Sequence, residues 1–366
     1  MSLKAPAKPT VVRHELFTWV KVATSTSCRA HTLMVVDSHI AVIGAGSWGT
    51  TVASVVAQNH STMLWARRTE LAEQITTRHE NIDYLRGVVL TQSLSCSAKL
   101  QDVVRNASIV MMAVPSNGFR EVLIEVAKYI SDGVPIVSLA KGLERETLKR
   151  MSEVVADELT GHPVAVLTGP NLAHEILAGQ PAATVVACTD DVVAKQIQAL
   201  MTRPTLRVYT NPDVLGCEIG GVVKNVIAIA SGIVEGMGFG DNSKATLITR
   251  GLAEMSRLGV ALGANPSTFT GLAGIGDVIA TCASAQSRNN AVGLRLGKGE
   301  SIESITGSMK MVAEGVRSSL SVLQLAQRCK VDMPITQQVA AVCEGTTSAS
   351  DAMVQLMSRA SKAELD

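Results

Sequence analysis

The sequence predicts an α/β fold, with a doubly wound parallel sheet in the N-terminal half and an all-helical domain in the C-terminal half. Short apolar runs alternate with helix-length segments from Ser38 to Thr210, as in sheets built from crossover units. Beyond Asn211 the pattern is helical and dense in glycine. The 366 residues suffice for two domains, and 46% hydrophobic residues with only 3% aromatic ones favour an aliphatic core.

The expected strands are apolar runs that end near a glycine, a proline or a charged residue. Five of them would form the sheet, at residues 39–43, 61–65, 108–114, 135–140 and 163–168. Two more, at residues 183–188 and 206–209, flank a helical stretch and are expected to add strands at the sheet edge. The two domains would then occupy residues 38–212 and 213–366.

Residues 1–37 precede the first strand and carry more basic than acidic side chains. We expect a dispensable extension of no fixed structure. An organellar targeting segment, which is also basic and poor in acids, and a true start at Met34 are the alternatives.

Charge and cysteine content exclude several classes of protein. A formal net charge of +1 gives no reason to expect a nucleic-acid partner. The seven cysteines include no C-x-x-C pair and the histidines lack ligand spacing, so neither a disulfide framework nor a metal site is expected. No apolar stretch indicates a membrane span. Free cysteines suit a reducing compartment, which predicts a cytoplasmic protein.

Residues 39–49 carry the most informative local pattern. The apolar run from His39 to Ile43 leads into Gly44-Ala45-Gly46-Ser47-Trp48-Gly49, and Thr50 to Gln58 is expected to be helical. A strand, a G-x-G-x-x-G turn and a helix in this order favour a dinucleotide pyrophosphate site, with an ordinary glycine turn as the alternative. Gly44 permits the tight turn, Gly46 the approach of the phosphates and Gly49 close helix packing. Residues 38–212 are therefore expected to form a Rossmann-like, dinucleotide-binding domain.

The end of the second expected strand indicates which dinucleotide binds. An NAD site usually places an acid there for the ribose 2′-hydroxyl, but this chain has Arg67 and Arg68 and no acid until Glu70. Two guanidinium groups suit a 2′-phosphate, which favours NADPH, with NADH as the second cofactor. Two solvated surface arginines are the alternative.

Two lysines are candidates for acid–base chemistry. Lys141 follows an expected strand, and strand ends face the ligand crevice in such folds; a solvated loop lysine is the alternative. Lys224 lies in an otherwise apolar helix, so it must snorkel, pair with an acid or lower its pKa. Asp277, which follows three closely spaced glycines, is a candidate partner for Lys224 or a helix cap. Thr281 lies one helical turn beyond it.

Two polar clusters are candidates for anion binding. Gly169-Pro170-Asn171 follows an expected strand and opens an expected helix, with Asn171 as its N-cap or as a ligand contact. The stretch Ser287-Arg288-Asn289-Asn290 combines a guanidinium with two amides, which suits a phosphate; a helix-start cap is the alternative.

Glycine is concentrated between these clusters. Thirteen of the 29 glycines fall in residues 216–280. Because glycine costs about 1 kcal/mol relative to alanine inside a helix, this density implies close backbone approach or ligand contact.

These motifs together resemble the glycerol-3-phosphate dehydrogenases, and most closely their bacterial NAD(P)-dependent type. The matching stretches are G-A-G-S-W-G at 44–49, S-L-A-K-G-L-E at 138–144, T-G-P-N at 168–171, V-V-K-N at 222–225, G-L-A-G-I-G-D at 271–277 and S-R-N at 287–289. The resemblance covers roughly residues 38–355. It implies a Rossmann-like domain, a helical substrate-binding domain and an active site between them.

The resemblance also implies site residues, carried over by position. For catalysis it implies Lys224 as proton donor and acceptor, with Lys141 and Asp277 beside it. For the substrate it implies Lys141, Gly169, Asn171, Lys224, Asn225, Asp277, Ser287, Arg288 and Asn289. For the cofactor it implies Ser47, Trp48, Arg67, Arg68, Lys141, Ala173, Arg288, Val312 and Glu314, besides Gly44, Gly46 and Gly49 of the turn. Asn171 departs from the family, which usually has Ser or Thr there.

The reaction implied is the interconversion of dihydroxyacetone phosphate and sn-glycerol 3-phosphate by hydride transfer with NAD(P)H, which supplies glycerophospholipid synthesis. Two alternatives stay open: a related β-hydroxyacid dehydrogenase-like reductase with a carboxylate substrate, and a non-catalytic NADP(H)-binding sensor. The expected partner is a small molecule. A homodimer is compatible with the sequence.

Overall fold

A computed structural model describes residues 38–309, 313–361 and 363 of the chain. The expected extension at residues 1–37 and the expected cofactor contact Val312 lie outside the described residues.

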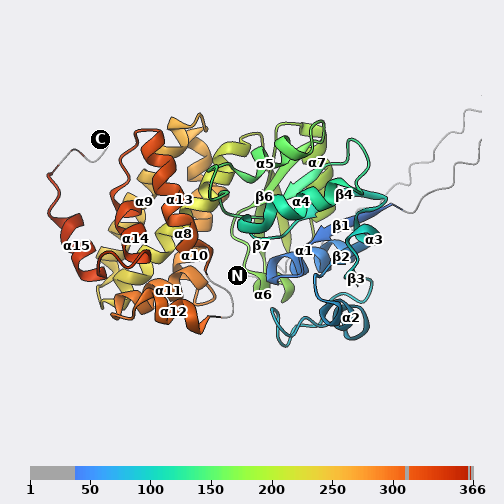
Figure 1. The fold of residues 1–366 in the computed structure, drawn as a ribbon, viewed down its shortest axis with the longest axis horizontal. Coiled ribbons are helices and arrows are strands. Elements are labelled where there is room, and N and C mark those ends of the chain that lie inside the picture. The colour runs from blue at the N-terminus through green and yellow to red at the C-terminus, as the bar shows by residue number, and fades with distance from the viewer. Residues whose placement is uncertain (1–37, 310–312, 362, 364–366) are drawn as a thin grey trace, which may run out of the picture. The chain divides into compact units, whose positions relative to one another are not determined.

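The described residues form one eight-stranded sheet with helices packed against it, followed by a run of helices (Figure 1). The strands are β1 (His39–Ile43), β2 (Thr62–Trp65), β3 (Ser95–Ser97), β4 (Ala107–Met112), β5 (Ile136–Ser138), β6 (Val164–Thr168), β7 (Ala182–Cys188) and β8 (Leu206–Asn211). Their order is β3-β2-β1-β4-β5-β6-β7-β8. The first six strands of this order are parallel, which is the 3-2-1-4-5-6 arrangement typical of dinucleotide-binding sheets. The predicted doubly wound α/β fold is confirmed.

Helices connect the strands and make up the C-terminal part. Those among the strands are α1 (Ser47–Ala57), α2 (Thr69–Arg78), α3 (Leu100–Val104), η1 (Ser116–Gly118), α4 (Phe119–Ala127), α5 (Met151–Glu158), α6 (Ala173–Leu177) and α7 (Asp191–Met201). Those that follow are α8 (Val214–Gly236), α9 (Asp241–Ala261), η2 (Pro266–Thr270), η3 (Leu272–Gly276), α10 (Asp277–Ala283), α11 (Arg288–Gly297), α12 (Ile302–Ser308), α13 (Glu314–Arg328), α14 (Pro334–Cys343) and α15 (Ala349–Met357). The described elements after β8 are thus all helical, as predicted, whereas the exact boundary at residue 212 stays a prediction.

Three details differ from the sequence prediction. The strand β3 was not predicted, because its residues Ser-Cys-Ser carry no apolar run. The strand β7 pairs with β6 antiparallel, since the connection between them holds only the five-residue helix α6 in place of a full crossover. The helix α1 begins at Ser47, three residues before the predicted Thr50, so the glycine turn leads directly into it.

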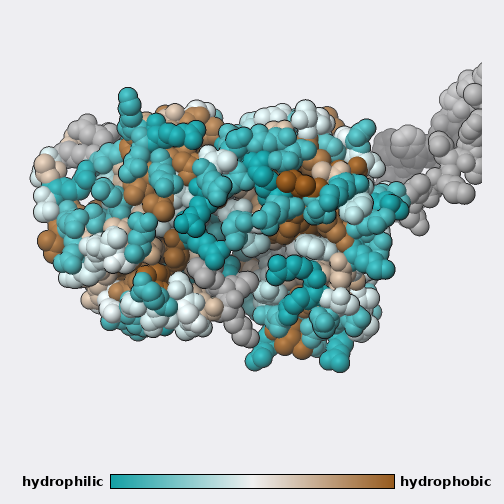
Figure 2. All heavy atoms as spheres, in the orientation of Figure 1, coloured by the Kyte–Doolittle hydropathy of each residue, from teal (hydrophilic) through white to brown (hydrophobic). Residues whose placement is uncertain are grey.

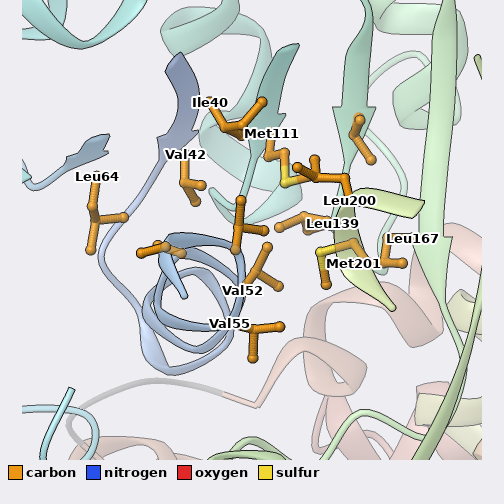
Figure 3. Close-up of a cluster of buried hydrophobic side chains, with 14 of the residues drawn as sticks. Ile40, Val42, Val52, Val55, Leu64, Met111, Leu139, Leu167, Leu200 and Met201 are labelled. Carbon is orange, nitrogen blue, oxygen red and sulfur yellow. The ribbon is translucent and has the colours of Figure 1, made fainter. Parts of the chain in front are cut away.

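The sheet core is aliphatic, as the composition predicts. Figure 3 shows Val52 and Val55 of α1 in one cluster of buried side chains with Val42 and Met111 of the sheet. On the same side lie Leu200 and Met201 of α7, near Leu167 of β6. Val42, Val52, Met111, Leu167 and Met201 are all fully buried, so α1 and α7 cover the sheet on the side that carries the glycine turn.

The helix α8 is the central element of the helical part, and glycines let its neighbour α11 approach it closely. A Cβ at Gly232 would lie 2.2 Å from the carbonyl oxygen of Asn290, and one at Gly293 would lie 2.0 Å from that of Ile229. Gly236 and Gly297, one turn further along each helix, meet in the same way. The prediction that the dense glycines mark close backbone approach is therefore confirmed at this contact.

Among the described residues, α8 alone is long and apolar enough to cross a bilayer, yet its entire apolar window is buried inside the fold. Core packing therefore accounts for its composition. On the face drawn in Figure 2, hydrophilic side chains predominate and hydrophobic ones gather in separate patches.

A buried carboxylate ties α8 to the α/β part. Glu218 of α8 is 6% exposed and accepts hydrogen bonds from the Ser152 backbone N–H (2.9 Å), the Ser152 hydroxyl (2.5 Å) and Arg150 Nη1 (2.7 Å), all at the start of α5. Burial raises the pKa of Glu218, an effect that Arg150 and Ser152 oppose. Glu218 lies less than two helical turns before Lys224, so its hydrogen bonds help to hold Lys224 against the sheet.

Candidate active site

The predicted lysines and Asp277 meet where the sheet faces the helical part. Lys141 follows β5, Gly169 follows β6, and both therefore lie at the carboxyl edge of the parallel sheet. Lys224 projects from the middle of α8, and Asp277 is the first residue of α10. Residues 136 positions apart in the chain thus share one site.

Asp277 bridges the two lysines. Its Oδ2 accepts a hydrogen bond from Lys141 Nζ at 2.6 Å, and its Oδ1 accepts one from Lys224 Nζ at 2.8 Å. Lys224 Nζ also donates to the Thr281 hydroxyl at 2.8 Å, and Lys141 Nζ donates to the Gly169 carbonyl at 2.9 Å. Of the three outcomes that the sequence allowed for Lys224, pairing with an acid is the one observed.

Close backbone packing makes this geometry available. A Cβ at Gly220 would lie 2.3 Å from the Ala273 carbonyl oxygen, so only glycine lets α8 touch the segment before Asp277. That segment, η3, is a single π-helical turn, a feature that recurs at functional sites. Gly221 leaves room for the stem of Lys141, whose Cγ would lie 3.4 Å from an added Cβ.

Burial and mutual charge set the ionisation of the three groups. Burial, opposed by Asp277 and reinforced by Lys224, lowers the pKa of Lys141 to about 8. Burial alone would raise the pKa of Asp277, but the two ammonium groups outweigh it and lower that pKa. With Asp277 ionised and both lysines protonated, the cluster carries a net positive charge suited to an anion.

Two amides connect the lysines to α11 and α13. Asn225 donates to the Lys141 carbonyl at 3.2 Å and accepts from Asn289 Nδ2 at 2.8 Å. Asn289 Oδ1 in turn accepts from the Gly315 backbone N–H at 3.0 Å. The structure therefore brings Asn225 and Asn289, both expected to contact the substrate, to the site. Their hydrogen bonds also hold the surrounding backbone in place.

The stretch predicted to bind an anion lies at the N-terminus of α11. Ser287 is the N-cap, and its hydroxyl accepts from the Asn290 backbone N–H at 3.2 Å. Arg288, the next residue, is exposed. A capped helix start and a guanidinium together suit a phosphate, so the capping and anion-binding interpretations of this stretch are compatible.

Asn171 does not cap α6, which corrects one of our predictions. The N-cap position is occupied by Leu172, because the helix starts two residues after Asn171. The Oδ1 and Nδ2 atoms of Asn171 are both buried, with no hydrogen-bond partner among the described residues. A buried amide without partners is costly, so Asn171 is left as a candidate ligand contact.

The glycine turn has the shape that a pyrophosphate requires. Gly44 has a φ of +118°, and a Cβ at Gly49 would lie 2.0 Å from the Gly44 carbonyl oxygen. At Gly46, by contrast, an added Cβ meets nothing within 4 Å, so the space above the turn is open. The start of α1, with Ser47 and Trp48 in its first turn, carries no side-chain cap. These features fit a dinucleotide phosphate.

The remaining expected cofactor residues lie around this turn and the sheet edge. Arg67 and Arg68 are exposed just after β2, and Ala173 begins α6. Glu314 Oε1 lies 3.5 Å from both the backbone N and the hydroxyl of Ser116, and burial raises the pKa of Glu314.

Two further residues belong to the site although the sequence analysis assigned them no role. Thr281 binds Lys224, and its position four residues after Asp277 on one helix face was the available signal. Asn81 donates to the Ala45 carbonyl at 3.0 Å and to the Thr50 hydroxyl at 2.8 Å, which anchors the loop after α2 to the glycine turn. No local pattern indicated that contact.

Comparison with known proteins shows the family to which the chain belongs. Residues 39–194 match the family model for the NAD-dependent glycerol-3-phosphate dehydrogenase N-terminus, and residues 213–354 match that for the C-terminus. The chain is 52% identical over 312 residues to glycerol-3-phosphate dehydrogenase (NAD(P)+) 2 of Sphingopyxis alaskensis, covering 85% of this chain and 94% of that protein. It is 51% identical over 329 residues to glycerol-3-phosphate dehydrogenase (NAD(P)+) of Corynebacterium glutamicum, covering 89% of this chain and 99% of that protein.

Solved structures give the same result. The crystal structure of glycerol-3-phosphate dehydrogenase from Coxiella burnetii matches with a TM-score of 0.85 at 35% identity, covering 88% of this chain and 99% of that one. A ketopantoate reductase from Ralstonia eutropha matches with a TM-score of 0.56 at 14% identity, covering 86% and 99%, and so shares the fold alone. The chain therefore belongs to the NAD-dependent glycerol-3-phosphate dehydrogenase family.

Proposed function

We propose that this protein interconverts dihydroxyacetone phosphate and sn-glycerol 3-phosphate with NAD(P)H as the hydride donor. The single observation that carries the proposal is the pair of lysines bridged by Asp277, close to the carboxyl edge of a dinucleotide-binding sheet. Its partner is thus a small molecule, and its product would supply glycerophospholipid synthesis.

Lys224 is the proposed proton donor and acceptor. Bound NADPH supplies the hydride when the ketone is reduced, and negative charge then develops on the carbonyl oxygen. Lys224, as an ammonium, donates a proton to that oxygen, while Lys141 stabilises the developing charge. Asp277 orients both ammonium groups, because each donates to a different oxygen of its carboxylate.

The substrate phosphate would bind at the start of α11. Arg288 and the first backbone N–H groups of that helix offer charge and hydrogen-bond donors, with Ser287 and Asn289 beside them. Asn171 and Gly169 would line the substrate from the sheet side. Fixing the phosphate places the reacting carbon relative to the lysines, which is the entropic part of catalysis.

The cofactor would lie along the glycine turn, with its pyrophosphate over Gly46 at the start of α1. Arg67 and Arg68 suit the 2′-phosphate of NADPH, and NADH is the second cofactor. Trp48, Ala173 and Glu314 would complete the site, together with Val312, which lies outside the described residues.

The two alternatives fit the observations less well. Arg288 would suit a carboxylate as well as a phosphate, so the first alternative is disfavoured by the comparisons instead. The relatives at 52% and 51% identity are glycerol-3-phosphate dehydrogenases, whereas the ketopantoate reductase shares the fold alone. A cofactor sensor would need neither a buried lysine pair nor the carboxylate that bridges it. We expect a cytoplasmic protein. A homodimer is compatible with the sequence, and light scattering of the purified chain measures the assembly state.

The pKa of Lys141 predicts the pH dependence of ketone reduction. Because burial lowers this pKa to about 8, the second positive charge is present below pH 8 and is lost as the pH rises through that value. The kcat/KM for the ketone, which reports the ionisation of the free enzyme, should therefore fall above about pH 8. The phosphate of the substrate stays dianionic over this range, since phosphate monoesters have a second pKa of about 6. A decrease that begins only near the ordinary lysine pKa would contradict the assignment of this pH dependence to Lys141.

The direct test of the proposed function is consumption of reduced nicotinamide with each candidate substrate. The assay follows the absorbance of NADPH, and separately of NADH, with dihydroxyacetone phosphate and with a panel of 2-keto and 3-hydroxy acids. Turnover with dihydroxyacetone phosphate alone supports the proposal. Turnover with a keto acid alone favours the first alternative, and cofactor binding without any oxidation favours the sensor.

A further inference from the structure

The cofactor region contains an acidic residue that the proposed function does not use. Asp83 lies in the loop that follows α2, outside the position after β2 where NAD sites carry their acid. Its neighbours fix this loop: Asn81 is fully buried and binds the glycine turn at Ala45 and Thr50, and Leu85 is 1% exposed. Asp83 is thereby held close to the region where the adenosine ribose of a dinucleotide would lie.

Asp83 forms an ion pair with Arg68. The Nη2 atom of Arg68 donates to Asp83 Oδ2, and the two side chains are 53% and 45% exposed. Arg68 occupies the N-cap position of α2, directly after β2. The guanidinium proposed to bind the 2′-phosphate is therefore already engaged by a carboxylate of the same protein.

The surroundings of this pair are rich in carboxylates. A hollow of about 340 Å³ beside the pair is lined by Arg68 and Asp83 and by one face of α2, including Glu70, Glu73 and Arg78. A phosphate that approached Arg68 would meet the charge of Asp83 at close range. It would also have to replace Asp83 as the acceptor for Nη2.

We propose that Asp83 is a specificity-determining residue of the cofactor site. By holding Arg68, Asp83 opposes binding of the 2′-phosphate of NADPH. It thereby reduces the difference between the affinity for NADPH and the affinity for NADH. The inference rests on the proposed contact between Arg68 and that phosphate. NADH carries no 2′-phosphate, so the same carboxylate does not oppose its binding.

The test compares Asp83→Asn with the wild-type chain by fluorescence titration of NADPH and NADH. The substitution keeps the size of the side chain and removes its charge, and Asn81 and Leu85 continue to hold the loop. The Kd for NADPH should fall about two- to fivefold, the range expected for an exposed ion pair, while that for NADH stays unchanged. This gain in NADPH affinity should shrink as the salt concentration is raised.

Asp191→Asn is the matched control. Asp191 is also an exposed, ion-paired carboxylate, bound to Lys195 on α7, so the substitution changes net charge by the same amount. Both cofactors should bind this variant as they bind the wild type. An equal gain in NADPH affinity for Asp191→Asn and Asp83→Asn would overturn the inference, because overall charge would then explain it.

The variant Arg68→Met separates this inference from the contact on which it rests. We expect it to weaken NADPH binding and to abolish the gain from Asp83→Asn when the two substitutions are combined. If Arg68→Met weakens NADPH binding but Asp83→Asn does not strengthen it, the inference fails and the contact stands. If Arg68→Met has no effect, the contact and the inference both fail. Turnover with dihydroxyacetone phosphate tests the reaction separately in each case.

Discussion

Replacing Lys224 with methionine is expected to lower kcat for the reduction of dihydroxyacetone phosphate by at least about 100-fold, the lower range for loss of a general acid. Methionine fills a similar volume in the apolar helix α8 and has no proton to donate. Asp277 keeps Lys141 as its ion-pair partner, so no carboxylate is left without a counter-charge. The fold and the affinity for NADPH should therefore persist.

Turnover is measured by the absorbance of the reduced cofactor, with circular dichroism and NADPH titration as checks on folding and binding. Lys195→Met is the matched control, since Lys195 is an exposed lysine in an ion pair on α7 and should leave turnover unchanged. Near-normal turnover of Lys224→Met would remove this residue from the mechanism.

Replacing Asp277 with asparagine should lower both stability and turnover. The carboxylate is 1% exposed and bridges both lysines, so its neutral analogue leaves two ammonium groups facing each other in a buried site. Removing one partner of a buried ion pair typically costs about 3–5 kcal/mol in the free energy of unfolding. Asp277 raises the pKa of Lys141 in the wild type, so that pKa should fall in the variant. The decrease of kcat/KM at alkaline pH should then begin at lower pH.

Urea unfolding measures the first effect, and the pH profile of kcat/KM measures the second. The double variant Lys141→Met/Asp277→Asn removes one of the uncompensated charges, so it should recover part of the stability without recovering turnover. Asp191→Asn on the exposed face of α7 is the control for loss of an acidic side chain. If Asp277→Asn keeps the stability and the alkaline pH dependence of the wild type, then Asp277 neither stabilises the fold nor sets the pKa of Lys141.

The sequence predicted those parts of the site that local chemistry determines. The turn from Gly44 to Gly49 was predictable because strand, glycine spacing and helix all lie within one short segment. Lys224 was recognisable because an ammonium group in an apolar helix needs a partner. Asp277 was one of few acids near the dense glycines that could supply it. The alternation of apolar runs likewise predicted the parallel sheet.

The parts that were missed depend on contacts between distant segments. Asn81 binds the Ala45 carbonyl across 36 residues, and nothing in its own neighbourhood indicates this. The ion pair of Arg68 with Asp83 joins a strand end to a loop beyond the next helix. The cap expected at Asn171 failed because α6 begins two residues after it, and helix boundaries follow from packing as much as from the capping residue.

The most direct test of the central claim is a crystal structure of the protein with NADPH and sn-glycerol 3-phosphate bound. We expect Lys224 Nζ within hydrogen-bond distance of the C2 oxygen, at about 3 Å, with Arg288 and the start of α11 on the phosphate. A C2 oxygen beyond the reach of Lys224, or a phosphate bound away from α11, would contradict the account.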